Sequence, residues 1–309
     1  MKIVSGSSNR PLAEKIAFSL NIPLVKSSLK IFSNKEFCVK IFEELTGEDV
    51  FVIQSTSFPV NDNLMELMIT LDAIKSNNPR SVTAVIPYFG YSRQDRQTIT
   101  SSSIPANLIA QLIITSGADK IITVDLHSEH LRKFSNLSLQ NVPITSVFYE
   151  AIASDYLPKD TLIISPDQGG IDRAHALAKL LNLDVVSLYK RRHAESGTCI
   201  MSLETSVKGR PCILIDDIVD TAETLCKASE TLKQAEAKSV KAYITHGVLT
   251  GDAVKRIEAS CLDNVYITDS IYSSILNHKC LKIQSLSVAP LIIEALTTNL
   301  ASGLSPIPL

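Results

Sequence analysis

Short, almost wholly apolar runs alternate with longer amphipathic stretches throughout this chain of 309 residues. Runs such as KIITVDL, LIISPD and CILIDD show no polar alternation, which is typical of strands whose two faces are both covered by helices. Parallel strands need crossover connections, usually helices, so the alternation predicts an α/β fold with mainly parallel sheets flanked by helices. We expect strands at Lys2–Ser5, Val50–Gln54, Thr83–Pro87, Ile121–Asp125, Thr161–Ser165, Asp184–Leu188, Cys212–Asp216 and Ala242–His246. We expect helices at Pro11–Leu20, Asn61–Ser76, Ile104–Ser116, Gly169–Leu181, Thr221–Ala235, Gly251–Glu258 and Ala289–Asn299.

The length is enough for two domains of ordinary size, and each half of the chain shows a similar series of strands and helices. We therefore expect two related α/β domains, residues 1–145 and 146–288, joined near Val142–Ser154. The C-terminal segment, about 289–309, is expected to pack back on the first domain. Its final stretch, ASGLSPIPL, has no periodicity and indicates a tail or a docking strand.

Composition and charge exclude several classes of protein. Hydrophobic residues make up 45% and charged residues 20%, which is typical of a globular chain, and the net charge of -2 provides no basic field for nucleic acid or an anionic membrane. No apolar run approaches the ~18 residues of a membrane-spanning helix, and the apolar start is too short for a signal peptide, so we expect a cytoplasmic protein. The 6 cysteines form no CxxC pair, which argues against zinc and against a disulfide framework.

The stretch CILIDDIVDTAET (Cys212–Thr224) carries the most specific chemistry. A buried strand is predicted to end at Asp216 and Asp217, and a helix follows at once. The free backbone N–H groups at the start of such a helix, with the hydroxyls of Thr221 and Thr224, can hold one phosphate. The two carboxylates cannot bind phosphate, but they can bind a ribose diol or a Mg²⁺ ion that bridges to it. A capped helix with solvated acids is the alternative.

This stretch resembles the 5-phosphoribosyl 1-diphosphate (PRPP) loop of type I phosphoribosyltransferases and of PRPP synthetases, the ribose-phosphate pyrophosphokinases. The usual D-D-x-x-D-T-x-G-T reads D-D-I-V-D-T-A-E-T here, so Glu223 puts a carboxylate in the place of a glycine and removes backbone freedom. The resemblance implies two type I phosphoribosyltransferase-like domains. It assigns ribose 5-phosphate binding to Asp216, Asp217, Asp220, Thr221, Ala222, Glu223 and Thr224.

Three further segments resemble PRPP synthetases and not the transferases. VIPYFGYSRQDR places Arg93 and Gln94 beyond a predicted strand; guanidinium groups suit a triphosphate, although such a run read alone is more often a solvated turn. TVDLHSEH places His127 after a strand end, where a histidine either contacts metal or phosphate or is structural. LKIFSNKEFCVKI carries Phe32, which can stack on a base and, in the family, reaches a neighbouring subunit's site. The resemblance assigns ATP binding to Phe32, Asn34, Glu36, Arg93, Gln94 and His127.

Two more segments complete the predicted catalytic site. IISPDQGGIDR ends a strand near Asp167, and its glycines let the backbone approach a ligand, although a helix cap is an equal alternative. LYKRRHAESG puts basic residues at a strand end, where they either form a solvated face or neutralise phosphate charge in a transition state. The resemblance assigns catalysis to Lys190 and Arg192, and metal binding to His127 and Asp167, with Mg²⁺ as the cofactor.

The predicted function is that of a ribose-phosphate diphosphokinase, which transfers diphosphate from Mg–ATP to the 1-hydroxyl of ribose 5-phosphate for nucleotide biosynthesis. The resemblance also implies a homo-oligomer, a hexamer built from dimers, with neither nucleic acid nor membrane as a partner. Two alternatives remain. Glu223, Lys35 in place of another glycine, and the lack of basic residues after Arg96 in RQTITSSSIPANL favour a weakly active or inactive regulatory homologue that binds synthetase subunits. A phosphoribosyltransferase that consumes PRPP is disfavoured by the ATP-type segments.

Overall fold

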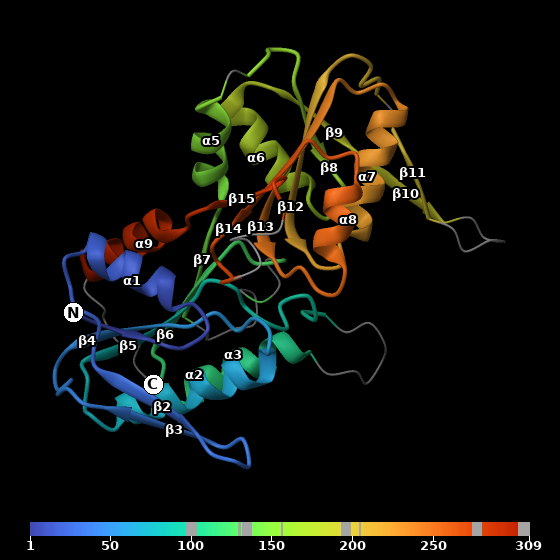
Figure 1. Cartoon of the computed structure of the whole chain (residues 1–309). Coiled ribbons are helices and arrows are strands. Elements are labelled where there is room, and N and C mark those ends of the chain that lie inside the picture. Colours follow the sequence, from blue (N-terminus) through green and yellow to red (C-terminus); the bar gives the residue numbers. More distant parts are fainter. Residues whose placement is uncertain are drawn as a thin grey trace. The chain divides into compact units, whose positions relative to one another are not determined.

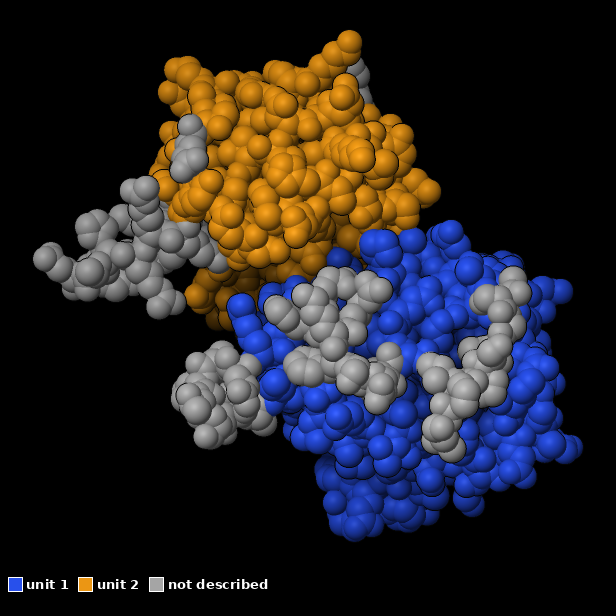
Figure 2. Space-filling model, turned by 180° about the vertical axis from the view of Figure 1, so that it is seen from behind, with its two compact units in different colours: residues 1–143, 270–272, 288–309 blue, residues 144–269, 273–287 orange. Residues whose placement is uncertain are grey.

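The chain forms two compact units, which Figure 2 shows in different colours: residues 1–143, 270–272 and 288–309, and residues 144–269 with 273–287. This computed structural model describes residues 1–96, 104–128, 131, 138–155, 157–192, 199–203, 205–273 and 280–301. Of residues 190–192 and 199–201 it describes the backbone alone. Within this described part, every helix is too short or too polar to cross a bilayer.

The first unit is built on a 5-stranded parallel sheet with the order β1-β4-β5-β6-β7. Figure 1 shows α1 and α9 on one side of this sheet and α2 and α3 on the other. The strands are β1 (Lys2–Ser5), β4 (Asp49–Ile53), β5 (Ser81–Ile86), β6 (Lys120–Val124) and β7 (Leu139–Val142). The helices are α1 (Arg10–Ser19), α2 (Val60–Lys75), α3 (Pro105–Thr115) and α9 (Ala289–Ala301). An antiparallel hairpin of β2 (Ser27–Ile31) and β3 (Phe37–Ile41) forms a separate small sheet.

The second unit has a 6-stranded parallel sheet with the order β15-β14-β13-β12-β8-β9. Helices α5 and α6 lie on one side of it and α7 and α8 on the other (Figure 1). The strands are β8 (Leu162–Ser165), β9 (Asp184–Ser187), β12 (Pro211–Val219), β13 (Ser239–Gly247), β14 (Asn264–Thr268) and β15 (Ile283–Leu286). The helices are α5 (Thr145–Ala153), α6 (Ile171–Leu181), α7 (Glu223–Gln234) and α8 (Ala253–Ala259). A hairpin of β10 (Tyr189–Arg192) and β11 (Cys199–Ser202) is antiparallel.

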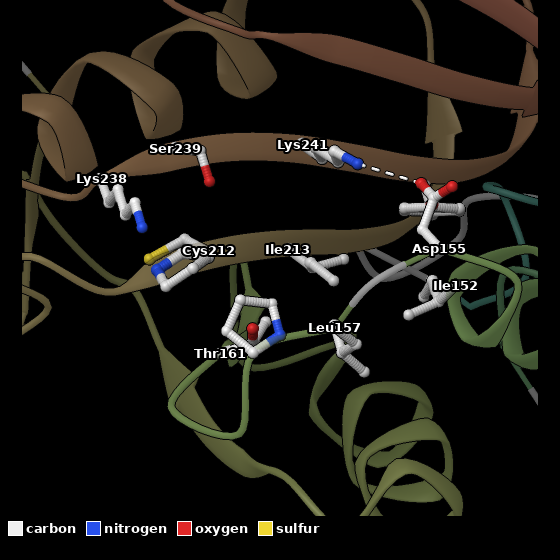
Figure 3. Close-up of a pocket in the computed structure, with 12 residues that line it drawn as sticks. Ile152, Asp155, Leu157, Thr161, Cys212, Ile213, Lys238, Ser239 and Lys241 are labelled. Atoms are coloured by element: carbon white, nitrogen blue, oxygen red, sulfur yellow. Dashed lines mark hydrogen bonds and ion pairs between the residues drawn. The ribbon is translucent and has the colours of Figure 1, made fainter.

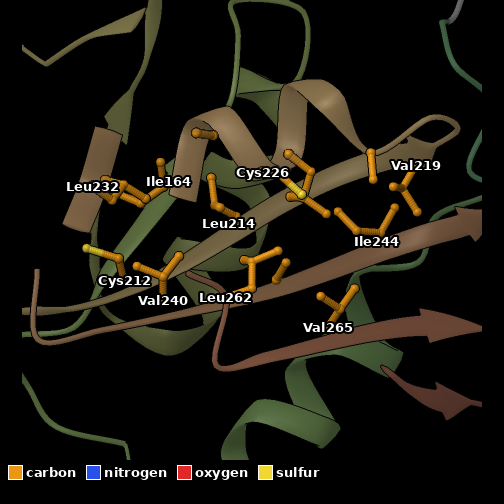
Figure 4. Packing of buried hydrophobic residues seen from close by; sticks show 14 of the residues in the cluster. Ile164, Cys212, Leu214, Val219, Cys226, Leu232, Val240, Ile244, Leu262 and Val265 are labelled. Atoms are coloured by element: carbon orange, nitrogen blue, oxygen red, sulfur yellow. The ribbon is translucent and has the colours of Figure 1, made fainter. Parts of the chain in front are cut away.

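The apolar runs of the sequence form the cores of the two units. Every residue of β4, β5 and β8 is buried, which explains why these strands lack polar alternation. In the second unit, side chains of β8, β12, β13, β14 and the helix α7 pack into one cluster, part of which Figure 4 shows. Leu214 on β12 and Leu232 on α7 are both completely buried in this cluster.

The predicted α/β class with helix-flanked parallel sheets is confirmed, and each predicted strand and helix is present; the strand Lys2–Ser5 has the predicted bounds and the others have shifted ends. Two predictions of bounds were wrong in ways that affect the site: the strand predicted to end at Asp216 continues to Val219, and the helix predicted from Thr221 begins at Glu223. The predicted joint Val142–Ser154 is largely the helix α5. The assignment of an ATP domain and a ribose 5-phosphate domain stays a prediction.

The core of the second unit can be tested with two leucines of opposite exposure. Leu214→Ala should lower the free energy of unfolding by about 2–5 kcal/mol, because it removes buried methyl groups and leaves a cavity. The matched control is Leu180→Ala on α6, whose side chain is 55% exposed, and it should change stability by less than about 0.5 kcal/mol. Urea denaturation followed by circular dichroism measures both. Equal losses in the two variants would contradict this core.

Candidate functional site

The acidic end of β12 lies within the sheet and not in a loop. Ile218 and Val219 pair with His246 and Gly247 of β13, so the strand continues past both aspartates. Successive side chains of a strand point to opposite faces. The two carboxyl groups of this pair nevertheless interact directly; Asp216 is half-buried and Asp217 is buried.

The electrostatics of this pair come from its neighbours in the same unit. Burial, then the Asp217 carboxylate, and to a smaller extent Asp167, raise the pKa of the Asp216 carboxyl well above its ordinary value. Arg173 on α6 acts in the opposite direction, and its Nη1 lies 3.8 Å from Asp217 Oδ1. The backbone N–H of Asp217 also donates to Asp216 Oδ1 at 2.9 Å. The arrangement presents acceptor oxygens to hydroxyl donors and repels phosphate.

Asp167 follows β8, which is the neighbour of β12 in the sheet. Its Oδ1 accepts the backbone N–H groups of Gly169 at 3.0 Å and Gly170 at 3.2 Å, so the side chain closes the turn that precedes α6. A Cβ atom on Gly170 would meet Ser165 Oγ at 3.1 Å. At Gly170, the close approach that the two glycines predict is therefore made to the protein itself. The Asp167 side chain holds the turn before α6 and makes no cap hydrogen bond to this helix.

The turn from Asp220 to Thr224 is held from outside by two residues. Thr250 Oγ1 donates to Asp220 Oδ1 at 2.5 Å, and the Thr250 N–H donates to the Asp220 carbonyl at 3.1 Å. Arg256 on α8 donates to the Thr221 carbonyl. Ala222 adopts the left-handed conformation with φ of 63° and forms the N-cap of α7. Among the described residues, no side-chain hydrogen bond caps this helix, which leaves its first N–H groups available as an anion site requires.

The residue that departs from the PRPP loop pattern fits this turn without strain. Glu223 is the first residue of α7 and has ordinary helical geometry; the left-handed residue is Ala222. Glycine's backbone freedom is therefore not needed at Glu223, contrary to the sequence-based expectation. Its carboxylate lies 3.5 Å from the guanidinium of Arg256, which offsets the negative charge beside the predicted phosphate position.

Lys190 and Arg192 lie on β10, where their backbones pair with Met201 and Cys199 of β11. The predicted catalytic residues thus belong to a hairpin and not to the end of a sheet strand. Their side chains lie outside what the structure describes, as do residues 193–198 between the two strands.

The first unit brings two of the predicted ATP segments together. Arg93 and Gln94 are exposed in a turn after β5, and Asp95 beside them is buried. The Ser128 hydroxyl donates to the Asp95 carboxylate, which ties this turn to the loop of the exposed His127 after β6. The segment without basic residues, 97–103, lies outside the described residues.

Phe32, Asn34 and Glu36 lie in the turn of the β2–β3 hairpin. Phe32 is 41% exposed, and Lys30 Nζ lies 4.8 Å from its ring centroid. Asn34 Oδ1 accepts the Glu36 N–H at 3.2 Å. Lys35 has φ of 71°, in the left-handed region that favours the glycine of the family pattern. In contrast to Glu223, this departure does affect the backbone, at a cost of about 1–2 kcal/mol.

Comparison with known proteins decides the family. Residues 1–117 match the N-terminal domain of ribose phosphate pyrophosphokinase, and residues 192–301 match the phosphoribosyl synthetase-associated domain. A ribose-phosphate pyrophosphokinase of Granulibacter bethesdensis is 47% identical over 296 residues, which is 96% of each chain. One of Caulobacter vibrioides is 47% identical over 298 residues, again 96% of each chain. The chain belongs to the ribose-phosphate pyrophosphokinase family.

A solved structure supports the same assignment. The phosphoribosylpyrophosphate synthetase of Mycobacterium smegmatis matches with a TM-score of 0.91 at 30% identity, covering 98% of this chain and 99% of that one. The predicted family and the predicted fold of two phosphoribosyltransferase-like domains are confirmed.

Sequence reasoning on this pyrophosphokinase family member missed Arg173, Thr250 and Arg256, which hold or balance the predicted ribose 5-phosphate residues. The sequence did contain a signal for Arg173, because this arginine is the first basic residue after the DQGG motif. None existed for Thr250 and Arg256, since only the packing of the loop after β13 and of α8 brings them to the turn.

The raised pKa of Asp216 predicts that this carboxylate destabilises the pyrophosphokinase fold at neutral pH. An acid whose pKa is raised on folding stabilises the protein only while protonated, and this contribution is lost as the pH rises from the ordinary value of 3.8 through the folded pKa. Asp216→Asn should therefore raise Tm at pH 7 by roughly 2–4 °C, the shift that about 1 kcal/mol produces. The gain should shrink near pH 4. Calorimetric scans across pH measure it, and an equal gain at both pH values would contradict the prediction.

Proposed function

We propose that this chain is a ribose-phosphate diphosphokinase that makes PRPP and AMP from ribose 5-phosphate and ATP. The observation that carries the proposal is the pair Asp216–Asp217 near the carboxyl end of β12, with the start of α7 at Glu223 after a short turn, in a member of this family. The pair suits ribose hydroxyls, and the helix start suits the 5-phosphate. One strand–turn–helix segment can thereby bind both the hydroxyls and the phosphate of ribose 5-phosphate.

Ribose 5-phosphate would bind along this segment. Its 2- and 3-hydroxyls donate to Asp216 and Asp217, and its phosphate accepts from the N–H groups at the start of α7 and from the hydroxyls of Thr221 and Thr224. Asp220 is already engaged by Thr250, so it shapes the turn and leaves phosphate binding to its neighbours. Such binding fixes the position of the 1-hydroxyl, which lowers the entropic cost of the reaction.

The reaction is an in-line displacement. The 1-hydroxyl oxygen forms a bond to the β-phosphorus of ATP, the bond from that phosphorus to the α,β-bridging oxygen breaks, and AMP leaves while the hydroxyl proton passes to water. Negative charge on the transferred oxygens must be balanced as this happens. We assign this role to Lys190 and Arg192 on the β10–β11 hairpin, and the binding of the ATP phosphates to Arg93, Gln94 and His127.

Magnesium fits the proposed chemistry as a partner of the nucleotide. Among the described residues, no group of three or more His, Cys, Asp or Glu side chains could hold a metal by itself. Mg²⁺ typically takes one or two carboxylates and completes its shell with phosphates and waters. We propose Asp167 as a metal-binding residue of the second unit and His127 as one of the first unit. When bound, the ion neutralises charge on the phosphates of ATP.

The Phe32 turn supports a homo-oligomer. An aromatic ring that is 41% exposed at the end of a hairpin, with Asn34 and Glu36 beside it, is suited to adenine recognition outside its own sheet. We propose that it serves the ATP site of a neighbouring subunit. The hexameric state and the cytoplasmic location stay predictions.

The decisive experiment is to mix the protein with ATP, Mg²⁺ and ribose 5-phosphate and to follow AMP and PRPP by chromatography. Lys190→Ala should lower kcat by about 10²–10³, the typical loss of one group that stabilises transition-state charge, while ribose 5-phosphate binding persists. Lys208→Ala is the control, since Lys208 is an exposed lysine of the same unit that pairs with Glu236. Absence of AMP with the unchanged protein would favour a regulatory homologue, and PRPP consumption with a free base would favour a phosphoribosyltransferase.

Arg173 provides a test of the ribose end. Arg173→Gln leaves the Asp216–Asp217 pair with less compensation for its charge repulsion, so both carboxylates accept hydroxyls less well. The KM for ribose 5-phosphate should rise roughly five- to tenfold, which corresponds to about 1–1.4 kcal/mol, with little change in kcat. Arg80→Gln, which breaks an arginine–aspartate pair in the first unit, is the matched control and should leave this KM unchanged. A fall in kcat with unchanged KM would place Arg173 elsewhere in the mechanism.

A further inference from the structure

A cavity of about 190 Å³ lies in the second unit, at the edge of the sheet where β8, β12 and β13 begin. Figure 3 shows Lys238, Ser239 and Lys241 along one side of it and Leu157 and Thr161 along the other. Since β12 runs from Pro211 to Val219, this edge is opposite to the one that carries the ribose 5-phosphate residues. The cavity is therefore separate from the proposed substrate site.

The walls of this cavity are largely apolar and well fixed. Ile152, Leu157 and Ile213 contribute aliphatic surface, and Tyr243 contributes part of its ring. That ring stacks on Tyr266 with the centroids 4.4 Å apart and meets Phe148 edge-on at 5.7 Å. Such a rigid lining favours a compact hydrophobic ligand body, because little order has to be imposed on binding.

The charge of the lining is positive. Lys241 Nζ pairs with Asp155 at 3.2 Å, so these two charges offset each other. Lys238 makes no ion pair with any residue that the structure describes. Burial raises the pKa of the Cys212 thiol to about 11, so the thiol is uncharged at neutral pH. One ammonium group thus remains to attract an anion at the mouth of an apolar cavity.

One polar group of the wall lacks a partner. The hydroxyl oxygen of Thr161 is buried and has no hydrogen-bond partner among the described residues. Buried hydroxyl groups are normally hydrogen-bonded, because burying one without a partner costs free energy.

We propose that this cavity is a binding site for a small organic monoanion, namely a single ring or short aliphatic chain that carries one carboxylate. An apolar cavity of ~150 Å³ is known to hold benzene, so 190 Å³ accommodates one ring with a substituent. The ring packs on Tyr243 and Ile213, and the carboxylate accepts from Lys238. ATP is too large and too highly charged for this site. The inference does not depend on the proposed enzymatic function.

Benzoate and benzyl alcohol are suitable probes, because they share a ring and differ in charge. Isothermal titration of the full chain should show saturable binding of both, with benzoate tighter. Lys238→Gln should weaken benzoate about two- to fivefold, the range of a partly exposed ion pair, and leave benzyl alcohol unchanged. Lys208→Gln, which removes an exposed lysine outside the cavity, should affect neither.

A steric variant separates this site from unspecific binding. Ser239 lines the cavity from β13, so Ser239→Leu should fill part of the space and abolish binding of both probes. Its Tm, measured alongside, identifies any loss that comes from unfolding. Lack of saturable benzoate binding to the unchanged protein would overturn the proposal. So would a benzoate affinity of Lys238→Gln and of folded Ser239→Leu that equals the affinity of the unchanged protein.

Discussion

Carboxylates that repel one another at the carboxyl ends of two adjacent parallel strands are the constraint on which the second unit depends. β8 leads to Asp167, and its neighbour β12 carries Asp216 and Asp217. Burial and mutual repulsion raise the pKa of Asp216, and Arg173 compensates only part of the charge. Such a cluster is unfavourable for folding but leaves acceptor oxygens available to hydroxyl donors. The apolar core of the unit must therefore offset the free energy that the cluster costs.

The turn beyond β12 depends on groups that are distant in the sequence. Thr250 holds Asp220, and Arg256 holds the carbonyl of Thr221 and pairs with Glu223. The N-cap residue of α7 is Ala222, which has no polar side chain, so it leaves the first N–H groups of the helix available, as an anion site needs. These features also explain how a glutamate can stand where relatives of the pattern have glycine, because residue 223 is helical and its charge is paired.

In the first unit, too, a contact between residues far apart in the sequence positions the predicted site residues. The buried Asp95 accepts a hydrogen bond from Ser128 and joins the Arg93 turn to the His127 loop, so one contact positions two groups suited to phosphate. The Phe32 hairpin, by contrast, stands outside the parallel sheet and presents an exposed ring. The Arg93 turn and the His127 loop therefore suit phosphate binding, and the hairpin suits recognition of a flat base.

The sequence by itself determined the α/β class, most of the buried strands and the acidic segment after Cys212, because buried parallel strands are apolar on both faces and the PRPP pattern is local. It did not indicate β2, β3, β7, β10, β11, β14 or β15. Of these, β7 (LQNV) and β10 (YKRR) are short and polar or charged and become strands through pairing with neighbours. Only the tertiary structure decided that β12 continues to Val219, that Arg173 faces Asp217, and that Arg256 offsets Glu223. Each of these depends on residues far apart in the chain, and their approach is a result of packing that no local pattern contains.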